Sequence, residues 1–80
     1  MIIIPIFKKK TMSKLKKKFG QKVQSLRLEA GITQEQLADA VGLTIESISN
    51  IERGIFGPKF DNLEKIAEVL GVPVKELFDF

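Results

Sequence analysis

Cysteine and histidine are both absent from this chain of 80 residues. Without cysteine, the fold has neither disulfides nor thiolate metal sites to support it. Without histidine, it lacks the commonest general base and the commonest metal ligand. No carboxylate pair lies beside a nucleophile or a phosphate-binding loop. We therefore expect no enzyme and no bound metal or cofactor.

Long apolar runs are also missing, and none approaches the roughly 18 residues that a membrane span requires. Residues 1–7 carry no charge and are largely apolar, but this run is too short for the core of a secretory signal. Basic residues follow the run, whereas they precede the apolar core in such signals. We expect a cytoplasmic protein that does not enter a membrane.

Acidic residues are absent from positions 1–22, which hold eight lysines. Positions 23–80 hold five basic and ten acidic residues, so the net charge of +3 combines a basic arm with an acidic body. An anionic partner would meet the arm first.

The arm is expected to cover residues 1–12, as a flexible segment or a short strand, ahead of a single domain over residues 13–80. Pro5 interrupts its β-branched run and would confine a strand to the edge of a sheet. Two interpretations remain open. The first is a tail, or residues that precede a true start at Met12. The second is an apolar strand that contacts a second subunit.

The apolar pattern of the domain predicts helices throughout. Ser13 is the expected N-cap of the first helix, and Gly31 its expected end. Gly20 weakens this helix by about 1 kcal/mol relative to alanine. The apolar residues between the two ends predict one buried stripe: Leu15, Phe19, Val23, Leu26 and Ala30.

The middle of the chain predicts two short helices joined by a tight turn. Thr33 is an N-cap that forms a capping box with Gln36, and Gly42 suits the left-handed backbone that ends a helix. Thr44 is the N-cap of the next helix, which ends at Gly54. Because the connection is too short for an antiparallel pair, the two helices must cross steeply, in the helix-turn-helix geometry.

The last part of the chain predicts two more helices. The fourth carries Asp61 in its first turn and ends at Gly71, and Pro73 begins a fifth, short helix. Their apolar positions are Leu63, Ile66, Ala67, Leu70, Val74, Leu77 and Phe78. The predicted fold class is therefore all-α.

The central stretch resembles the helix-turn-helix of the phage repressor and Cro-type regulators, a family also described as xenobiotic-response-element-like. The residues that carry the resemblance are Thr33-Gln34-Glu35-Gln36-Leu37-Ala38, Val41-Gly42, Ile48-Ser49-Asn50-Ile51-Glu52-Arg53-Gly54 and Pro58. The resemblance extends over about residues 19–78. It implies a compact five-helix, lambda-repressor-like DNA-binding domain with a basic N-terminal arm.

A thin polar face runs along the predicted third helix, opposite Ile48 and Ile51. In the family this face reads bases from its N-terminal end. The resemblance therefore implies five candidate base-reading residues: Thr44, Ile45, Glu46, Ser49 and Asn50. Asparagine can pair with adenine, glutamate can accept from cytosine N4, and isoleucine can contact a thymine methyl. The competing interpretation is that these side chains are simply solvated.

The predicted third helix has no lysine or arginine before Arg53. Phosphate neutralisation supplies much of the affinity for DNA, so other cations and polar groups must provide it. The candidate phosphate contacts are Gln34, which matches a phosphate-contacting position of the family, and Thr33, Arg53, Lys59, Lys18 and Lys22. Arg27 and Glu52 match two positions that form an internal ion pair in relatives, and we expect them to be structural.

These observations predict a sequence-specific DNA-binding transcriptional regulator that binds a two-fold operator in double-stranded DNA as a homodimer. It resembles stand-alone phage repressors and the small controller regulators of restriction-modification operons. The alternative is a protein-interaction module, in which the acidic body binds a protein such as a toxin or a polymerase subunit. Such a module would bind DNA only weakly.

Overall fold

The computed structural model describes residues 9–80, with side chains from Lys14 onward. Over this range the chain forms α1 (Lys9–Glu29), α2 (Gln34–Val41), α3 (Ile45–Glu52), α4 (Phe60–Leu70) and the 3-10 helix η1 (Val74–Phe78). The predicted all-α class is confirmed. The fifth helix is a 3-10 helix, since after Pro73 only five residues remain helical and the Glu76 N–H bonds to the Pro73 carbonyl three residues back.

α1 begins at Lys9, so Ser13 lies inside this helix and is not the N-cap that the sequence predicts. Lysine is a good helix former, and serine is tolerated in a helix interior. Residues 9–12 of the predicted arm are therefore helical. The strand considered for the segment before them lies outside the described residues.

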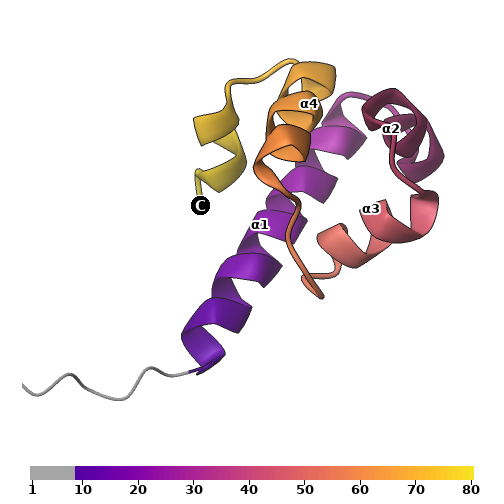
Figure 1. The fold of residues 1–80 in the computed structure, drawn as a ribbon. Helices are drawn as coiled ribbons and strands as arrows, with labels where there is room; N and C mark the ends of the chain where they lie inside the picture. Colours follow the sequence, from indigo (N-terminus) through magenta and orange to yellow (C-terminus); the bar gives the residue numbers. More distant parts are fainter. Residues whose placement is uncertain (1–8) are drawn as a thin grey trace, which may run out of the picture.

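The helices pack around one core, with α1 running along its length (Figure 1). α1 contacts α3 and η1, while α2 contacts α3 and α4, and α4 contacts η1. The buried apolar residues are Phe19, Val23, Leu37, Ala38, Val41, Ile48, Ile51, Ile66, Ala67, Leu70 and Leu77. The predicted stripe of α1 is only partly buried, because Leu15 is 52% exposed and Ala30 is also exposed.

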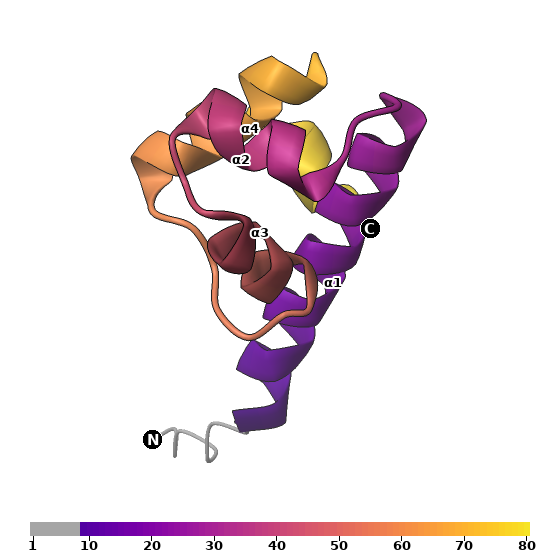
Figure 2. The same ribbon diagram turned by 90° about the vertical axis from the view of Figure 1, so that its right-hand side faces the viewer.

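The caps that define the helix-turn-helix form as predicted. The Thr33 hydroxyl accepts from the Gln36 N–H at 3.0 Å, and the Thr33 N–H donates to Gln36 Oε1 at 2.8 Å. Gly42 ends α2 with φ of 78°, in the left-handed region where a β-carbon is strained. Only two residues then separate Gly42 from α3, and the two helices run in different directions (Figures 1 and 2).

Gly20 is the point where α1 and α3 come closest. A β-carbon built there would lie 2.6 Å from the Glu52 carbonyl oxygen and closer still to that of Ile51. Glycine therefore lets the backbone of α1 touch the end of α3. The sequence predicts only the weakening of α1 at this position, not the close approach that requires glycine.

Candidate nucleic-acid interface

α3 is fixed by its inner face and by its first cap. Ile48 and Ile51 are 0% and 1% exposed. The Thr44 hydroxyl accepts a hydrogen bond from the Ser47 N–H at 3.0 Å. A helix of eight residues is too short to be stable alone, so these contacts and the crossing with α2 determine its orientation. Figure 2 shows α3 beside α1 and below α2.

The outer face of α3 brings together four of the predicted base-reading residues. Ile45 is 51% exposed, Glu46 is exposed, and Ser49 and Asn50 are half-buried. Together they present a carboxylate, a hydroxyl, a carboxamide and an apolar side chain. These groups match the hydrogen-bonding and methyl contacts that base edges offer in a major groove.

Thr44 has a different role from the other four predicted base-reading residues. Besides accepting from the Ser47 N–H, its hydroxyl donates to Ser47 Oγ at 3.0 Å. Its single proton is therefore already used, and the hydroxyl has none to donate to a base. In this arrangement Thr44 caps α3.

An ion pair lies behind the outer face, where Arg27 of α1 meets Glu52 of α3. Arg27 Nε donates to Glu52 Oε2 at 2.6 Å, and Nη2 donates to Oε1 at 3.1 Å. Arg27 is 7% exposed and Glu52 is 5% exposed. Arg27 Nη1 also donates to the Ile32 carbonyl at 2.9 Å, so the pair joins α1, α3 and the turn before α2.

Gln34, the first residue of α2, extends this network. Its Nε2 donates to Glu52 Oε1 at 2.9 Å, and its side chain is half-buried. A carboxamide nitrogen carries two protons, so one remains for a phosphate. Gln34 and Glu52 are 18 positions apart in the sequence, so no local pattern reveals this contact.

The other candidate phosphate contacts fall into two groups. Thr33, Arg53 and Lys59 are exposed at the N-cap of α2, the C-cap of α3 and the N-cap of α4. Lys18 and Lys22 instead lie about 160° around α1 from Gly20, the residue that touches α3. Their places on α1 turn both lysines away from α3.

Lys22 also has a partner on the far side of α1. Its Nζ lies 3.3 Å from Glu76 Oε2 on η1. Lys22 therefore has an acidic partner within the protein, and its contact with a phosphate stays a prediction. Such a partly exposed pair contributes little to stability, but it orients the lysine toward η1.

Lys17 is a basic residue near α3 that sequence reasoning missed. A β-carbon built on Gly54 would lie 2.8 Å from Lys17 Cα, so α1 touches the turn that ends α3 at this point. Lys17 itself is exposed. Its spacing of three residues from Gly20 is the signal that could have identified it, once Gly20 was recognised as a contact point.

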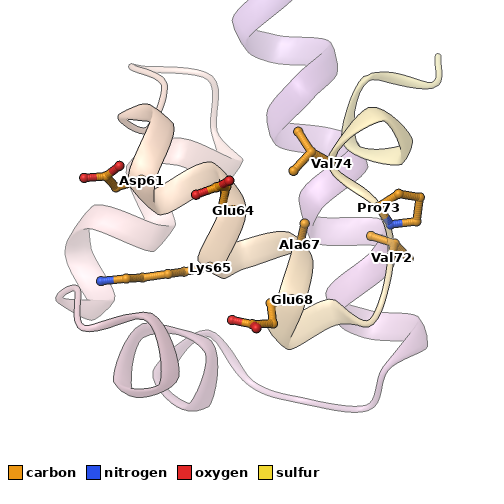
Figure 3. Close-up of a pocket in the computed structure, with 8 residues that line it drawn as sticks. All are labelled: Asp61, Glu64, Lys65, Ala67, Glu68, Val72, Pro73 and Val74. Atoms are coloured by element: carbon orange, nitrogen blue, oxygen red, sulfur yellow. The ribbon is translucent and has the colours of Figure 1, made fainter.

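The side of the molecule formed by α4 and η1 is acidic. A shallow hollow there is lined by α4 and by the segment that leads into η1, and the charged residues of α4 in it are three carboxylates and one ammonium: Asp61, Glu64, Glu68 and Lys65 (Figure 3). All three carboxylates are exposed. They would repel phosphate, so this side is unsuited to a DNA backbone.

Among residues 9–80, no helix is both long enough and apolar enough to cross a membrane. The same residues contain no group of three or more acidic side chains placed to hold a metal ion.

Known proteins share this arrangement. A model of the Helix-turn-helix family matches residues 23–77. The control protein C.BamHI of Bacillus amyloliquefaciens is 48% identical over 63 residues, which are 78% of either chain. The restriction-modification controller protein C.AhdI from Aeromonas hydrophila is 37% identical in its crystal structure, with a TM-score of 0.74 over 78% of this chain and 94% of that chain.

A similar structure has also been solved with DNA. The P22 c2 repressor protein, in complex with a synthetic operator, is 26% identical, with a TM-score of 0.73 over 76% of this chain and 92% of that chain. The matched region of the family model includes all of α2, α3 and α4. It omits residues 9–22 of α1.

Proposed function

The chain belongs to the helix-turn-helix family and is a DNA-binding transcriptional regulator, and on that premise we propose that it binds a two-fold operator as a homodimer, with α3 of each subunit in a major groove. The observation that carries this proposal is the outer face of α3. Its short, mixed polar side chains stand on a helix whose inner face is fully buried. Glu46, Ser49 and Asn50 read base edges, and Ile45 contacts a thymine methyl.

Phosphate contacts hold this helix in register. Several groups around α3 can make these contacts: the second side-chain N–H of Gln34, the N-terminal region of α2 with Thr33, and the cations Arg53 and Lys59. Such contacts position a protein on the duplex without reading its sequence. The ion pair of Arg27 and Glu52 stays inside the protein and orients α3.

An exposed apolar face supports the homodimer. Phe60 is 84% exposed, and Phe78 and Phe80 are 41% and 53% exposed. Phe60 and Phe78 line one groove together with Leu63 and Val74. A small protein rarely leaves so many large apolar side chains in water unless another surface covers them. We assign the subunit contact to this face of α4 and η1.

The likeness to two control proteins favours one regulatory role. C.AhdI is a restriction-modification controller protein, and this chain spans 94% of it. We propose the same role here, in which occupancy of an operator sets the expression of a restriction-modification system. Genes for a restriction enzyme and a methyltransferase beside the coding sequence of this chain would support the role, and their absence would contradict it.

The base-reading proposal is tested with duplexes that the wild-type protein recovers from a random pool. Each base pair is then substituted singly, and binding is titrated at fixed salt. Asn50→Ala is expected to weaken binding to the selected duplex and to leave binding to random DNA nearly unchanged. Glu46→Gln is expected to strengthen binding to random DNA and to relax the preference at one base pair by about 1–3 kcal/mol.

The reason for the second effect is electrostatic. A carboxylate on this face is favourable only beside a base that donates a hydrogen bond to it. Beside any other base it is left without a partner, and the DNA phosphates repel it. If neither variant alters the preference at any base pair, α3 does not read DNA. The protein-interaction module would then be the better explanation of this chain.

A further inference from the structure

The first half of α1 is not part of the hydrophobic core. Among the described side chains, Phe19 is the first on this helix to be buried. Residues 9–18 extend α1 by about 15 Å ahead of that point. They include six lysines and no acidic residue. Figure 1 shows this basic half of α1 projecting beyond the other helices.

One flank of this projecting segment lies against the end of α3. The backbone of Lys17 abuts Gly54, where a β-carbon would come within 2.8 Å of Lys17 Cα. One turn later, Gly20 abuts the Glu52 carbonyl. Lys17 lies about 60° around α1 from Gly20, whereas Lys18 lies about 160° from it. Lys17 is exposed, and it joins no ion pair among the described side chains.

This flank supplies the charge that α3 lacks. The only cation at α3 is Arg53, at its C-cap, and Glu46 places a negative charge on the reading face. Phosphates line both edges of a major groove, so a base-reading helix needs cations beside it. Lys17 stands beside the C-terminal end of α3, and its backbone is already fixed by helix packing.

We propose that Lys17 binds a DNA phosphate beside the C-terminal end of α3, so that the DNA-binding surface continues onto the first half of α1. The inference rests on the proposed function, since it requires α3 to lie in a major groove. It assigns phosphate binding to Lys17 and not to Lys18 and Lys22, which lie about 160° around α1 from Gly20.

The test compares the full-length chain with Lys17→Gln. Lys18→Gln is the matched control, because it removes the same charge from the adjacent residue, whose place on α1 is about 100° further from the contact with α3. Two probes are used: a duplex that the wild-type protein recovers from a random pool, and a duplex of random sequence. The binding constant for each is measured over salt concentrations from about 50 to about 200 mM.

Each lost phosphate contact lowers the logarithmic salt slope by about 1. We expect a slope shallower by about 1 for Lys17→Gln. Affinity should fall several-fold and equally for both probes, since phosphates carry no sequence information. Lys18→Gln should change the slope much less. Glutamine keeps the aliphatic carbons that contact Gly54, so thermal unfolding by circular dichroism should not shift.

Two results would overturn the inference. An unchanged slope in Lys17→Gln would mean that this lysine does not meet a phosphate. An equal effect of Lys18→Gln would mean that the lysines act only through their summed charge. In both cases wild-type binding and its base preference would persist, so the proposed function would survive. Failure of the wild-type protein to recover any duplex would instead contradict the proposed function itself.

Discussion

Arg27 and Glu52 show how a single residue pair fixes the position of α3. Both are buried, and their hydrogen bonds satisfy the polar atoms that burial removes from water. Burying two charges is costly, so the pair adds little net stability compared with an apolar pair of similar size. The pair instead orients α3, because its bidentate geometry permits only one placement of α3 against α1. Gln34 extends the same constraint to α2.

Arg27→Ala should destabilise the protein by about 3–5 kcal/mol, because it leaves the Glu52 carboxylate buried without a partner. Arg27→Met combined with Glu52→Leu should cost far less, since both charges are removed together. Denaturant titration of the two variants measures the difference. Equal losses in the single and double variants would show that side-chain packing, and not charge pairing, dominates at this site.

At residue scale, the sequence predicted the ion pair from family resemblance but not the contacts that surround it. Gln34 and Lys22 both have partners that lie far away along the chain, on α3 and η1. Such contacts depend on how the helices pack. A single sequence contains no local pattern that reveals them.

At the scale of elements, the helix-turn-helix was predictable because its signals are local. Each of its caps acts within four residues, so the local sequence is enough to recognise Thr33, Gly42 and Thr44 as caps. The start of α1 was not predictable in this way. Ser13 resembles a cap, but the lysines around it favour helix on both sides, so the helix continues through it.

Thr44→Ala should destabilise the protein by about 1 kcal/mol, because the Ser47 N–H loses its acceptor. It should also weaken binding to the selected duplex, since the first turn of α3 carries Ile45 and Glu46. Thr44→Ser keeps the hydroxyl and is the control. Urea unfolding and DNA titration of both variants provide the measurement. A fully active Thr44→Ala variant would show that α3 holds its first turn without the cap.

At the scale of the whole molecule, charge is separated along the fold. Lysines cover the projecting half of α1, while the carboxylates of Asp61, Glu64 and Glu68 occupy α4. This polarity would orient the molecule as it approaches DNA, and it would become weaker as salt increases. The apolar face of Phe60 and Phe78 lies between the two regions, since these residues also line a groove with Leu15 and Lys16 of the projecting half of α1.

Phe60→Asp should convert the proposed homodimer into a monomer, because it places a charge in the centre of the proposed contact. Its cost to the monomer should be small, since Phe60 is 84% exposed and a carboxylate is favourable in the first turn of α4. Leu28→Asp is the control, because Leu28 is 62% exposed and lies near the C-terminal end of α1. Sedimentation equilibrium measures the mass of each variant. A dimeric Phe60→Asp protein would place the subunit contact elsewhere.

The close approach at Gly20 has a consequence for reversion genetics. Any larger residue there meets the carbonyl oxygens of Ile51 and Glu52, which belong to the backbone. A clash between side chains can be relieved by trimming the neighbour, but no substitution in the chain removes a carbonyl oxygen. Selection for restored function after Gly20→Val should therefore return glycine at codon 20 itself, and very few suppressors at other positions.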